Sequence, residues 1–187
     1  MTTGLEISAN AVNALSVFLA ARNSIHTWWV GIVGCVLFGI VFFLSRLYAD
    51  TLLQLFFVGT SLIGWWQWLS GGGEGKGLAV TRVAGRTIVH VVLAAIVVAA
   101  GYGYALWRFT DAFAPFVDSL ILTLSVAGQL LLMRRKYESW WFWLIVNTLS
   151  VALFSARGLW VTAGLYSAFW INAVVALVRW RRLVISP

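Results

Sequence analysis

Long uncharged stretches, bounded by charged residues or glycine, dominate the pattern of hydrophobic and polar positions along the chain. A bilayer-spanning helix needs about 20 apolar residues, and six stretches approach or reach that length or can be extended to it at their ends. They are Thr27–Ser45, Thr51–Leu69, Thr87–Trp107, Ser119–Met133, Trp140–Ala156 and Leu159–Val178. The pattern therefore predicts six membrane helices, joined by short connections.

A seventh segment, Leu5–Ala21, is less regular. Its apolar residues recur at helical spacing, but Ser8, Asn10, Asn13 and Ser16 interrupt them. The segment is either a weak first transmembrane helix or an interfacial one. Farther along, the glycine-rich stretch Ser70–Gly77 predicts a flexible linker, and Pro115 predicts the start of a helix.

Composition supports a membrane protein. Of the 187 residues, 61% are hydrophobic and only 10% are charged, whereas a soluble domain carries about 25% charged residues. The chain is expected to be one membrane domain, residues 1–187, without a separate soluble part. Its one cysteine, Cys35, excludes an internal disulfide, and with only two histidines we expect no metal site and no cofactor.

The basic residues are distributed unevenly. If seven helices are counted, ten of the 13 Lys and Arg residues fall on one side of the membrane. These ten are Arg22, Lys76, Arg82, Arg86, Arg134, Arg135, Lys136, Arg179, Arg181 and Arg182. The positive-inside rule then places the C-terminus in the cytoplasm and the N-terminus outside. We therefore interpret the net charge of +7 as an orientation signal and not as a sign of nucleic-acid binding. The basic side chains are expected to contact anionic lipid.

An internal repeat organises the helices. Shifting the sequence by 112 residues without a gap places Arg22 on Arg134, Trp28 on Trp140 and Trp68 on Trp180. Residues 5–69 then form a first three-helix repeat, residues 70–110 a loop and linker helix, and residues 115–180 a second repeat. The predicted fold is an all-α integral membrane protein with seven transmembrane helices, in which a linker helix joins two parallel three-helix repeats (3+1+3). Such repeats are a transporter architecture, with the site near the midplane.

Several motifs resemble the PnuC family of vitamin transporters. They are Leu52–Phe57, Gly64–Trp68, Leu124–Gln129, Arg134–Trp140, Trp143 and Asn147. The resemblance implies facilitated diffusion of an unphosphorylated vitamin across the bacterial inner membrane, trapping by a cytoplasmic kinase, a fold similar to that of SWEET sugar transporters and, for some members, a homotrimer. One position departs from the family pattern: Ser139 stands where an asparagine often precedes the tryptophan, which leaves the substrate open.

Candidate binding residues follow from the chemistry of a flat, polar-edged vitamin. It calls for aromatic walls for stacking and for amides that both donate and accept hydrogen bonds. Polar residues inside membrane helices are candidate functional sites by default, although Asn and Gln also tie helices together. The candidates are Gln54, Trp65, Trp68, Gln129, Trp143, Asn147 and Asn172.

Other conspicuous residues have simpler interpretations. Five tryptophans at helix ends, Trp28, Trp29, Trp140, Trp141 and Trp180, are expected to be interfacial anchors. His90 lies in the linker helix and is expected to be peripheral. Since no acidic residue lies in mid-membrane, the sequence favours passive uniport over coupling to protons or sodium.

The predicted function is therefore facilitative transport of a vitamin, most directly nicotinamide riboside. Thiamine or riboflavin is the alternative substrate, and a non-transporting membrane subunit is the alternative role. No Ser–His–Asp, HExxH or paired-aspartate arrangement occurs in the helices, so an enzyme is not expected.

Overall fold

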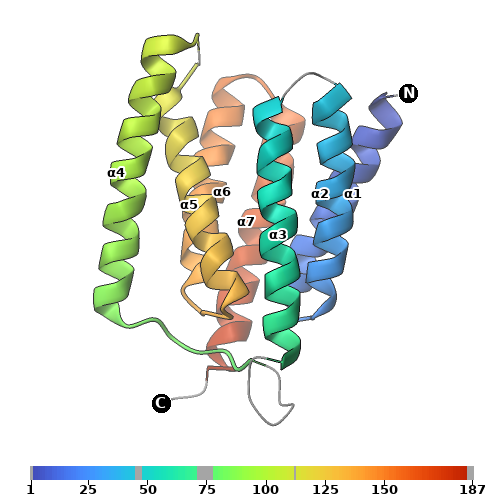
Figure 1. Ribbon diagram of the computed structural model, residues 1–187, viewed down its shortest axis with the longest axis vertical. Helices are drawn as coiled ribbons and strands as arrows, with labels where there is room; N and C mark the ends of the chain where they lie inside the picture. Colours follow the sequence, from blue (N-terminus) through green and yellow to red (C-terminus); the bar gives the residue numbers. More distant parts are fainter. Residues whose placement is uncertain (1, 45–47, 71–77, 112, 185–187) are drawn as a thin grey trace. The chain divides into compact units, whose positions relative to one another are not determined.

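The computed structural model describes residues 2–44, 48–70, 78–111 and 113–184, and these residues form seven α-helices (Figure 1). The helices are α1 (Thr2–Ala21), α2 (His26–Leu44), α3 (Tyr48–Ser70), α4 (Gly85–Phe109), α5 (Pro115–Met133), α6 (Ser139–Ala156) and α7 (Trp160–Arg181). The prediction of an all-helical chain is confirmed. The predicted linker Ser70–Gly77 lies, beyond Ser70, outside the described residues.

Five of these helices are long and apolar enough, by length and composition, to cross a membrane. They are α2, α4, α5, α6 and α7. In α1 and α3 the apolar runs are interrupted by polar side chains such as Asn10 and Asn13, or Gln54 and Gln67. Local composition alone therefore identifies these two helices less clearly as membrane-spanning. The sequence pattern already indicated this for the first segment.

The chain divides into two compact units. The first unit comprises Met1–Ala79 with the short segment Met133–Arg135, and the second comprises Val80–Leu132 with Lys136–Pro187. The first unit thus holds α1 to α3, and the second holds α4, most of α5, α6 and α7.

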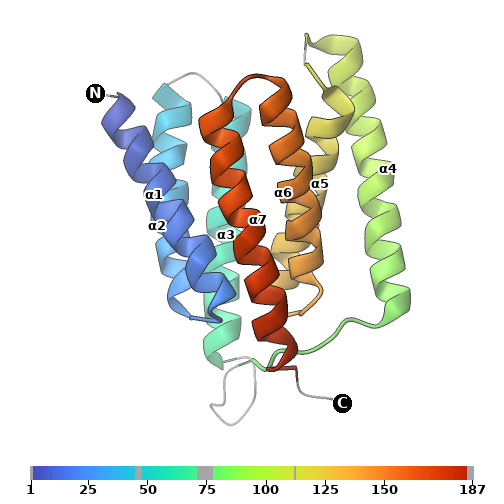
Figure 2. The same cartoon turned by 180° about the vertical axis from the view of Figure 1, so that it is seen from behind.

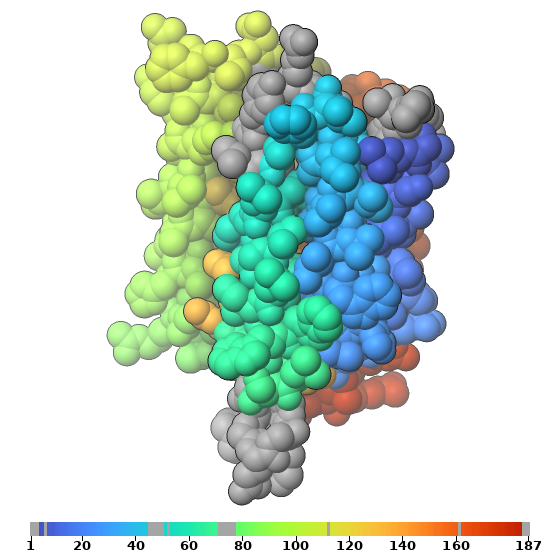
Figure 3. All heavy atoms as spheres, turned by 45° about the vertical axis from the view of Figure 1, so that its right-hand side comes forward, coloured from blue at the N-terminus to red at the C-terminus, as the bar shows by residue number. Residues whose placement is uncertain are grey.

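In the first unit α1 packs on α2, and α2 packs on α3. Figure 3 shows α2 and α3 side by side along one face. A reciprocal pair joins α1 to α2: the Thr27 hydroxyl donates to the Ser16 carbonyl, and the Ser16 hydroxyl donates to the Thr27 carbonyl, both at 2.8 Å. Gly64 allows α3 to approach α2 closely, because a Cβ there would lie 2.6 Å from the Trp28 ring. Small residues at such crossings are typical of membrane helices.

In the second unit α5 and α6 pack around a core of Ala95, Leu124, Leu131, Phe142 and Val146. Helix α4 contributes Ala95 to this core, and its Ile88, Val91 and Val92 pack against the core. The Ser119 hydroxyl of α5 donates to the Ala99 carbonyl at 2.8 Å. Much of the remaining α4 surface is apolar and exposed, including Val89, Leu93 and Val97. Figure 2 shows α4 beside α5 at the edge of this unit. His90 is also exposed, and its Nδ1 lies 2.7 Å from the Arg86 carbonyl of its own helix.

Two pairs of tryptophans are buried at corresponding places in the two units. Trp28 contacts Trp68 edge to face with ring centroids 5.2 Å apart, and Trp140 contacts Trp180 in the same way at 5.5 Å. All four side chains are at most 3% exposed. The expectation that Trp28, Trp140 and Trp180 are interfacial anchors is therefore wrong.

Their chain neighbours behave differently. Trp29 and Trp141 are 44% and 51% exposed, and the Trp29 indole donates to His26 Nδ1 at 2.8 Å. Adjacent residues on a helix point about 100° apart, so when one tryptophan of each Trp-Trp pair faces inward, the next one faces outward. The anchor interpretation fits only these two.

The two units share further local features at an offset of 112 residues. Helices α5, α6 and α7 begin and end within one residue of the positions that the offset gives from α1, α2 and α3. The turns that follow α1 and α5 each contain one non-glycine residue with positive φ, Asn23 (57°) and Arg135 (53°). This backbone conformation is uncommon outside glycine, so its recurrence agrees with the proposed repeat.

Candidate functional site

Two candidate residues share one face of α6. Trp143 and Asn147 are four residues apart, so both side chains project from the same side of the helix. Asn147 is only 5% exposed. Trp143 is half-buried and packs against the core of the second unit. A polar amide is costly in an apolar interior unless it is hydrogen-bonded, which makes this face the strongest candidate for ligand contact.

A hydroxyl that the sequence analysis missed extends this face. Ser150 is 1% exposed, its Oγ has no hydrogen-bond partner among the described residues, and it follows Asn147 by three positions, within one turn of α6. Its spacing from Asn147 was the available signal, but a single serine in an apolar helix rarely attracts attention.

Ser139, where the family resemblance leads us to expect an asparagine, begins α6. It is fully buried, and its Oγ makes no hydrogen bond within the described part of the chain. Its neighbour Glu138 has a defined role, because its carboxylate accepts a hydrogen bond from the Val83 backbone N–H at 2.9 Å.

The remaining candidates of the second unit lie on α5 and α7. Gln129 is half-buried and directly follows Gly128, whose backbone approaches Trp143. Asn172 is half-buried on α7 and already takes part in an interaction within the protein. Gln129 thus directly follows the α5 residue that lies against Trp143. For Asn172, a role in holding helices together fits at least as well as a role in ligand binding.

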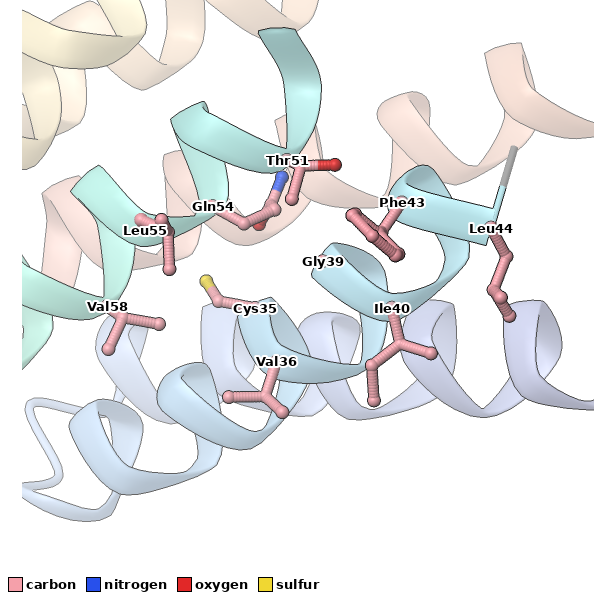
Figure 4. Close-up of a pocket in the computed structure, with 10 residues that line it drawn as sticks. All are labelled: Cys35, Val36, Gly39, Ile40, Phe43, Leu44, Thr51, Gln54, Leu55 and Val58. Atoms are coloured by element: carbon pink, nitrogen blue, oxygen red, sulfur yellow. The ribbon is translucent and has the colours of Figure 1, made fainter. Parts of the chain in front are cut away.

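In the first unit, Gln54 lines a cavity of about 280 Å³ between α2 and α3 (Figure 4). The wall is mainly apolar, and the Cys35 thiol points into the space between the two helices. The lining residues are Cys35, Val36, Gly39, Ile40, Phe43, Leu44, Thr51, Gln54, Leu55 and Val58. Thr51 and Gln54 are among the residues that line it, but their polar groups contribute almost nothing to its accessible wall, so a ligand role for Gln54 stays a prediction.

The two tryptophans of the motif Trp65-x-x-Trp68 lie in different environments. Trp68 is 3% exposed, and its indole N–H donates to the Met133 carbonyl at 3.2 Å. The Arg135 guanidinium lies over the Trp68 ring, 4.3 Å from its centroid. Trp65 is half-buried. The contacts of Trp68 are those of a packing residue, while Trp65 retains exposed ring surface, and a substrate role for either one stays a prediction.

Arg135 connects several parts of the first unit. Its Nε donates to the Asn23 side-chain oxygen at 2.9 Å, and its Nη1 donates to the Leu78 carbonyl. Burial lowers the pKa of this guanidinium, which lies in the turn between α5 and α6. Of the three consecutive basic residues, only Arg134 is exposed; Lys136 donates to the Thr81 hydroxyl at 2.8 Å. Two members of the cluster therefore have a structural role, because Arg135 and Lys136 bind loop segments.

Comparison with known proteins gives consistent results. A model of the family described as "Nicotinamide mononucleotide transporter" matches residues 3–182. The nicotinamide riboside transporter PnuC of Escherichia coli is 27% identical over 90% of this chain and 85% of its own length. PnuC of Neisseria mucosa is 22% identical over 94% and 71%. The riboflavin/roseoflavin transporter RibM of Streptomyces davaonensis is 26% identical over 82% and 73%.

The fold also matches a solved structure. The crystal structure of the vitamin B3 transporter PnuC superimposes with a TM-score of 0.74 at 22% identity, covering 97% of this chain and 82% of that one. The likeness confirms the seven-helix membrane fold. Because the family model spans nearly the whole sequence, the chain belongs to the nicotinamide mononucleotide transporter family, the family of the PnuC membrane transporters.

Proposed function

We propose that the protein carries an unphosphorylated vitamin, nicotinamide riboside in the first place, across the bacterial inner membrane by facilitated diffusion. The observation that carries the proposal is the amide of Asn147, a residue only 5% exposed, one turn from Trp143 on the same face of α6. The names of two relatives, the nicotinamide riboside transporters of Escherichia coli and Neisseria mucosa, favour this substrate.

The chemistry of this face suits the ligand. The pyridinium ring of nicotinamide riboside is flat and cationic, so an indole face attracts it by stacking and by cation–π interaction. Its carboxamide both donates and accepts hydrogen bonds, as does the Asn147 amide. The Ser150 hydroxyl, one turn away, is a further group that can bond a polar substituent.

Uniport by alternating access is the mechanism we favour. The six acidic residues of the sequence are Glu6, Asp50, Glu74, Asp111, Asp118 and Glu138, and all lie near helix ends or in connections. A membrane transporter driven by protons or sodium ordinarily needs an ionisable or coordinating group within the membrane. Net uptake would then be maintained by a cytoplasmic kinase that phosphorylates the vitamin and traps it.

The proposal also includes orientation and assembly. The charge distribution supports an orientation with the C-terminus in the cytoplasm and the N-terminus outside. The family resemblance supports a homotrimer, whose mass in detergent can be measured by light scattering. A 3+1+3 division of the helices agrees with the bounds of α1 to α3 and α5 to α7.

Riboflavin is the second candidate substrate. The specific observation in its favour is the 26% identity to a riboflavin/roseoflavin transporter over 82% of this chain. An isoalloxazine ring is also flat and edged with donors and acceptors, so the same indole and amide can serve it. Thiamine, the alternative from the sequence, is tested beside it.

The experiment is a binding titration on detergent-purified protein with nicotinamide riboside, riboflavin and thiamine. Nicotinamide riboside should raise the melting temperature, and Asn147→Ala should weaken its binding by about 10-fold, because a buried hydrogen bond to a ligand is lost. Ser125→Ala serves as the matched control, since the Ser125 hydroxyl bonds the Ile121 carbonyl of its own helix, and should change affinity little. Indifference of the wild type to all three vitamins would favour a non-transporting role.

A further inference from the structure

The cavity between α2 and α3 follows the two helices lengthwise. Its lining residues on α2 extend from Cys35 to Leu44, and those on α3 extend from Thr51 to Val58 (Figure 4). At the rise of an α-helix, the α2 wall is about 14 Å long. Several lining side chains, among them Ile40, are exposed apolar groups. The cavity is therefore elongated, and it opens on the outer surface of the first unit.

The size and the lining of the cavity suit an apolar chain. Its volume is about 280 Å³, and an apolar cavity of about 150 Å³ is already large enough to bind benzene. Its wall is almost wholly apolar, so it offers few of the hydrogen-bond partners that a buried water needs. An acyl chain, the component of the bilayer core, has both the matching chemistry and the elongated shape.

The second unit shows what occupies the equivalent place between its own helices. At an offset of 112 residues, the lining residues Val36 and Val58 correspond to Thr148 and Trp170. The Trp170 indole N–H donates to the Thr148 hydroxyl at 3.1 Å, so the indole reaches from α7 across to α6. Two valines can form no such bridge between α2 and α3.

Two more lining positions differ in the same direction. Gly39 corresponds to Val151, and Gln54 corresponds to Tyr166. The Tyr166 ring contacts Phe154 of α6 at 5.1 Å and Phe169 of its own helix at 5.7 Å between centroids. The cavity of the first unit therefore takes the place of aromatic side chains that join the two helices of the second unit.

The exposed lining residues differ in the opposite direction. Ile40, Phe43 and Leu55 are exposed and apolar, whereas the positions that correspond to them hold Ala152, Ser155 and Ser167. The first unit thus surrounds its cavity with larger apolar side chains at the surface, which extends the wall that a hydrocarbon chain can contact.

We propose that the cavity between α2 and α3 binds one acyl chain of a bilayer lipid, which lies along the two helices where the Trp170 indole lies in the second unit. The chain supplies the dispersion contacts with both helices that side chains supply between α6 and α7. The cavity is lined by the C-terminal half of α2 and the N-terminal half of α3, so the lipid belongs to the leaflet on the side of the α2–α3 connection. This inference goes beyond the proposed transport function and does not depend on which vitamin is carried.

The one cysteine of the chain is the reporter for the test. Cys35 is buried, and its thiol points into the space between α2 and α3 (Figure 4). The purified protein is reconstituted into vesicles of phosphatidylethanolamine and phosphatidylglycerol that contain a phospholipid with a diazirine in mid-chain. After irradiation, mass spectrometry should find a lipid adduct at Cys35, measured relative to adducts on the exposed Leu93 of α4. Adducts at Leu93 without one at Cys35 overturn the inference.

A double substitution copies the indole bridge of the second unit into the first. Val36→Thr with Val58→Trp should lower the adduct at Cys35 by about 10-fold, because a close-packed indole leaves the acyl chain no room. Leu62→Trp is the matched control: it adds the same ring one turn farther along α3, at an exposed position outside the cavity lining, and should leave the adduct unchanged. An equal adduct at Cys35 in both proteins overturns the inference.

A smaller substitution repeats the test if the double variant folds poorly. Gly39→Val introduces the residue of the second unit, and its Cβ would meet only Gln54 Cβ, at the ordinary contact distance of 3.7 Å. It should also lower the adduct at Cys35, and an unchanged adduct contradicts the proposal. If a second copy of the chain fills the cavity instead, the lipid adduct at Cys35 is absent in the wild type, and the double substitution lowers the mass of the detergent-solubilised protein in light scattering. That result overturns the assignment to a lipid.

Discussion

At the scale of single residues, tryptophans of the same local sequence have opposite environments. Trp28 and Trp29 are adjacent, yet the first is 2% exposed and the second 44%. The same holds for Trp140 at 2% and Trp141 at 51%. Membrane-interface statistics favour the exposed location for all of them. The buried members instead form edge-to-face pairs, a preferred arrangement of aromatic rings, and so hold one helix of each unit on another.

Removal of a buried tryptophan should therefore destabilise the protein, while removal of its neighbour should not. Trp28→Ala leaves a cavity against Trp68 and Gly64 and should reduce stability by about 3–5 kcal/mol. Trp29→Ala is the matched control and should change stability by less than about 0.5 kcal/mol. Thermal unfolding in detergent measures both. Equal melting temperatures for the two variants would contradict the assigned packing.

Arg135 shows how a residue from a basic cluster becomes structural. It bonds Asn23 and the Leu78 carbonyl and lies over the Trp68 ring. Arg135→Ala removes these contacts and should reduce stability by about 1–3 kcal/mol, as expected for charge-assisted hydrogen bonds. Arg134→Ala, at the exposed neighbouring position, should have little effect on the melting temperature. A larger loss from Arg134→Ala than from Arg135→Ala would show that this contact network is wrong.

At the scale of elements, the helices differ in how much of their surface is buried. Helix α4 exposes most of its apolar residues and attaches to its unit through a few positions near Ala95, Ala99 and Gly103. Such a helix fits a linker that is solvated by lipid along most of its length. By contrast, α6 buries residues along its whole length, among them Ser139, Asn147 and Ser150. The helix with the most buried polar groups is thus the one that carries the candidate site.

Two glycines of α4 test its attachment to α5. An added Cβ at Gly103 would lie 2.6 Å from Phe116 Cδ1, 2.8 Å from Ser119 Oγ and 3.1 Å from Phe116 Cα. Gly103→Ala should therefore separate the helices and destabilise the protein by about 1–3 kcal/mol. Gly101→Ala meets no atom within 4 Å and should stabilise by up to about 1 kcal/mol through helix propensity. If both variants melted alike, the close approach at Gly103 would be refuted.

At the scale of the whole molecule, scarcity of charge supports the proposed mechanism of passive transport. Only 10% of the residues are charged, and the acidic ones stand near helix ends or in connections. Helix α5 is typical, since its Asp118 lies in the first turn. A transporter with this distribution has no carboxylate in mid-membrane to carry a coupling ion, which favours passive movement of the substrate down its gradient.

Uptake into sealed vesicles that contain the purified protein and no kinase tests passive transport. Nicotinamide riboside should equilibrate across the membrane without accumulating, and an uncoupler should leave the initial rate unchanged. Inclusion of a kinase and ATP inside the vesicles should convert equilibration into accumulation. Abolition of uptake by the uncoupler, in the absence of kinase, would establish ion coupling and refute uniport.

The sequence alone determined the membrane class, the number and approximate bounds of the helices, the charge asymmetry and the family. These properties are local: a bilayer demands long apolar stretches, its faces sort basic residues, and motifs such as Gly64–Trp68 are contiguous. The bounds of α2, α6 and α7 agree with the predicted stretches to within a few residues for this reason. The amide of Asn147 could also be identified, because an amide in the middle of a membrane helix is conspicuous.

Only the tertiary structure decided which of these side chains have partners. Trp68 bonds a carbonyl 65 positions away, and Arg135 bonds Asn23 across 112 positions. Contacts over such separations leave no periodic trace in the sequence. Likewise, Gly128 is one of 17 glycines until the fold places Trp143 against it. Local pattern reports where a segment lies in the bilayer, whereas burial, pairing and the position of an indole depend on which helix packs beside it.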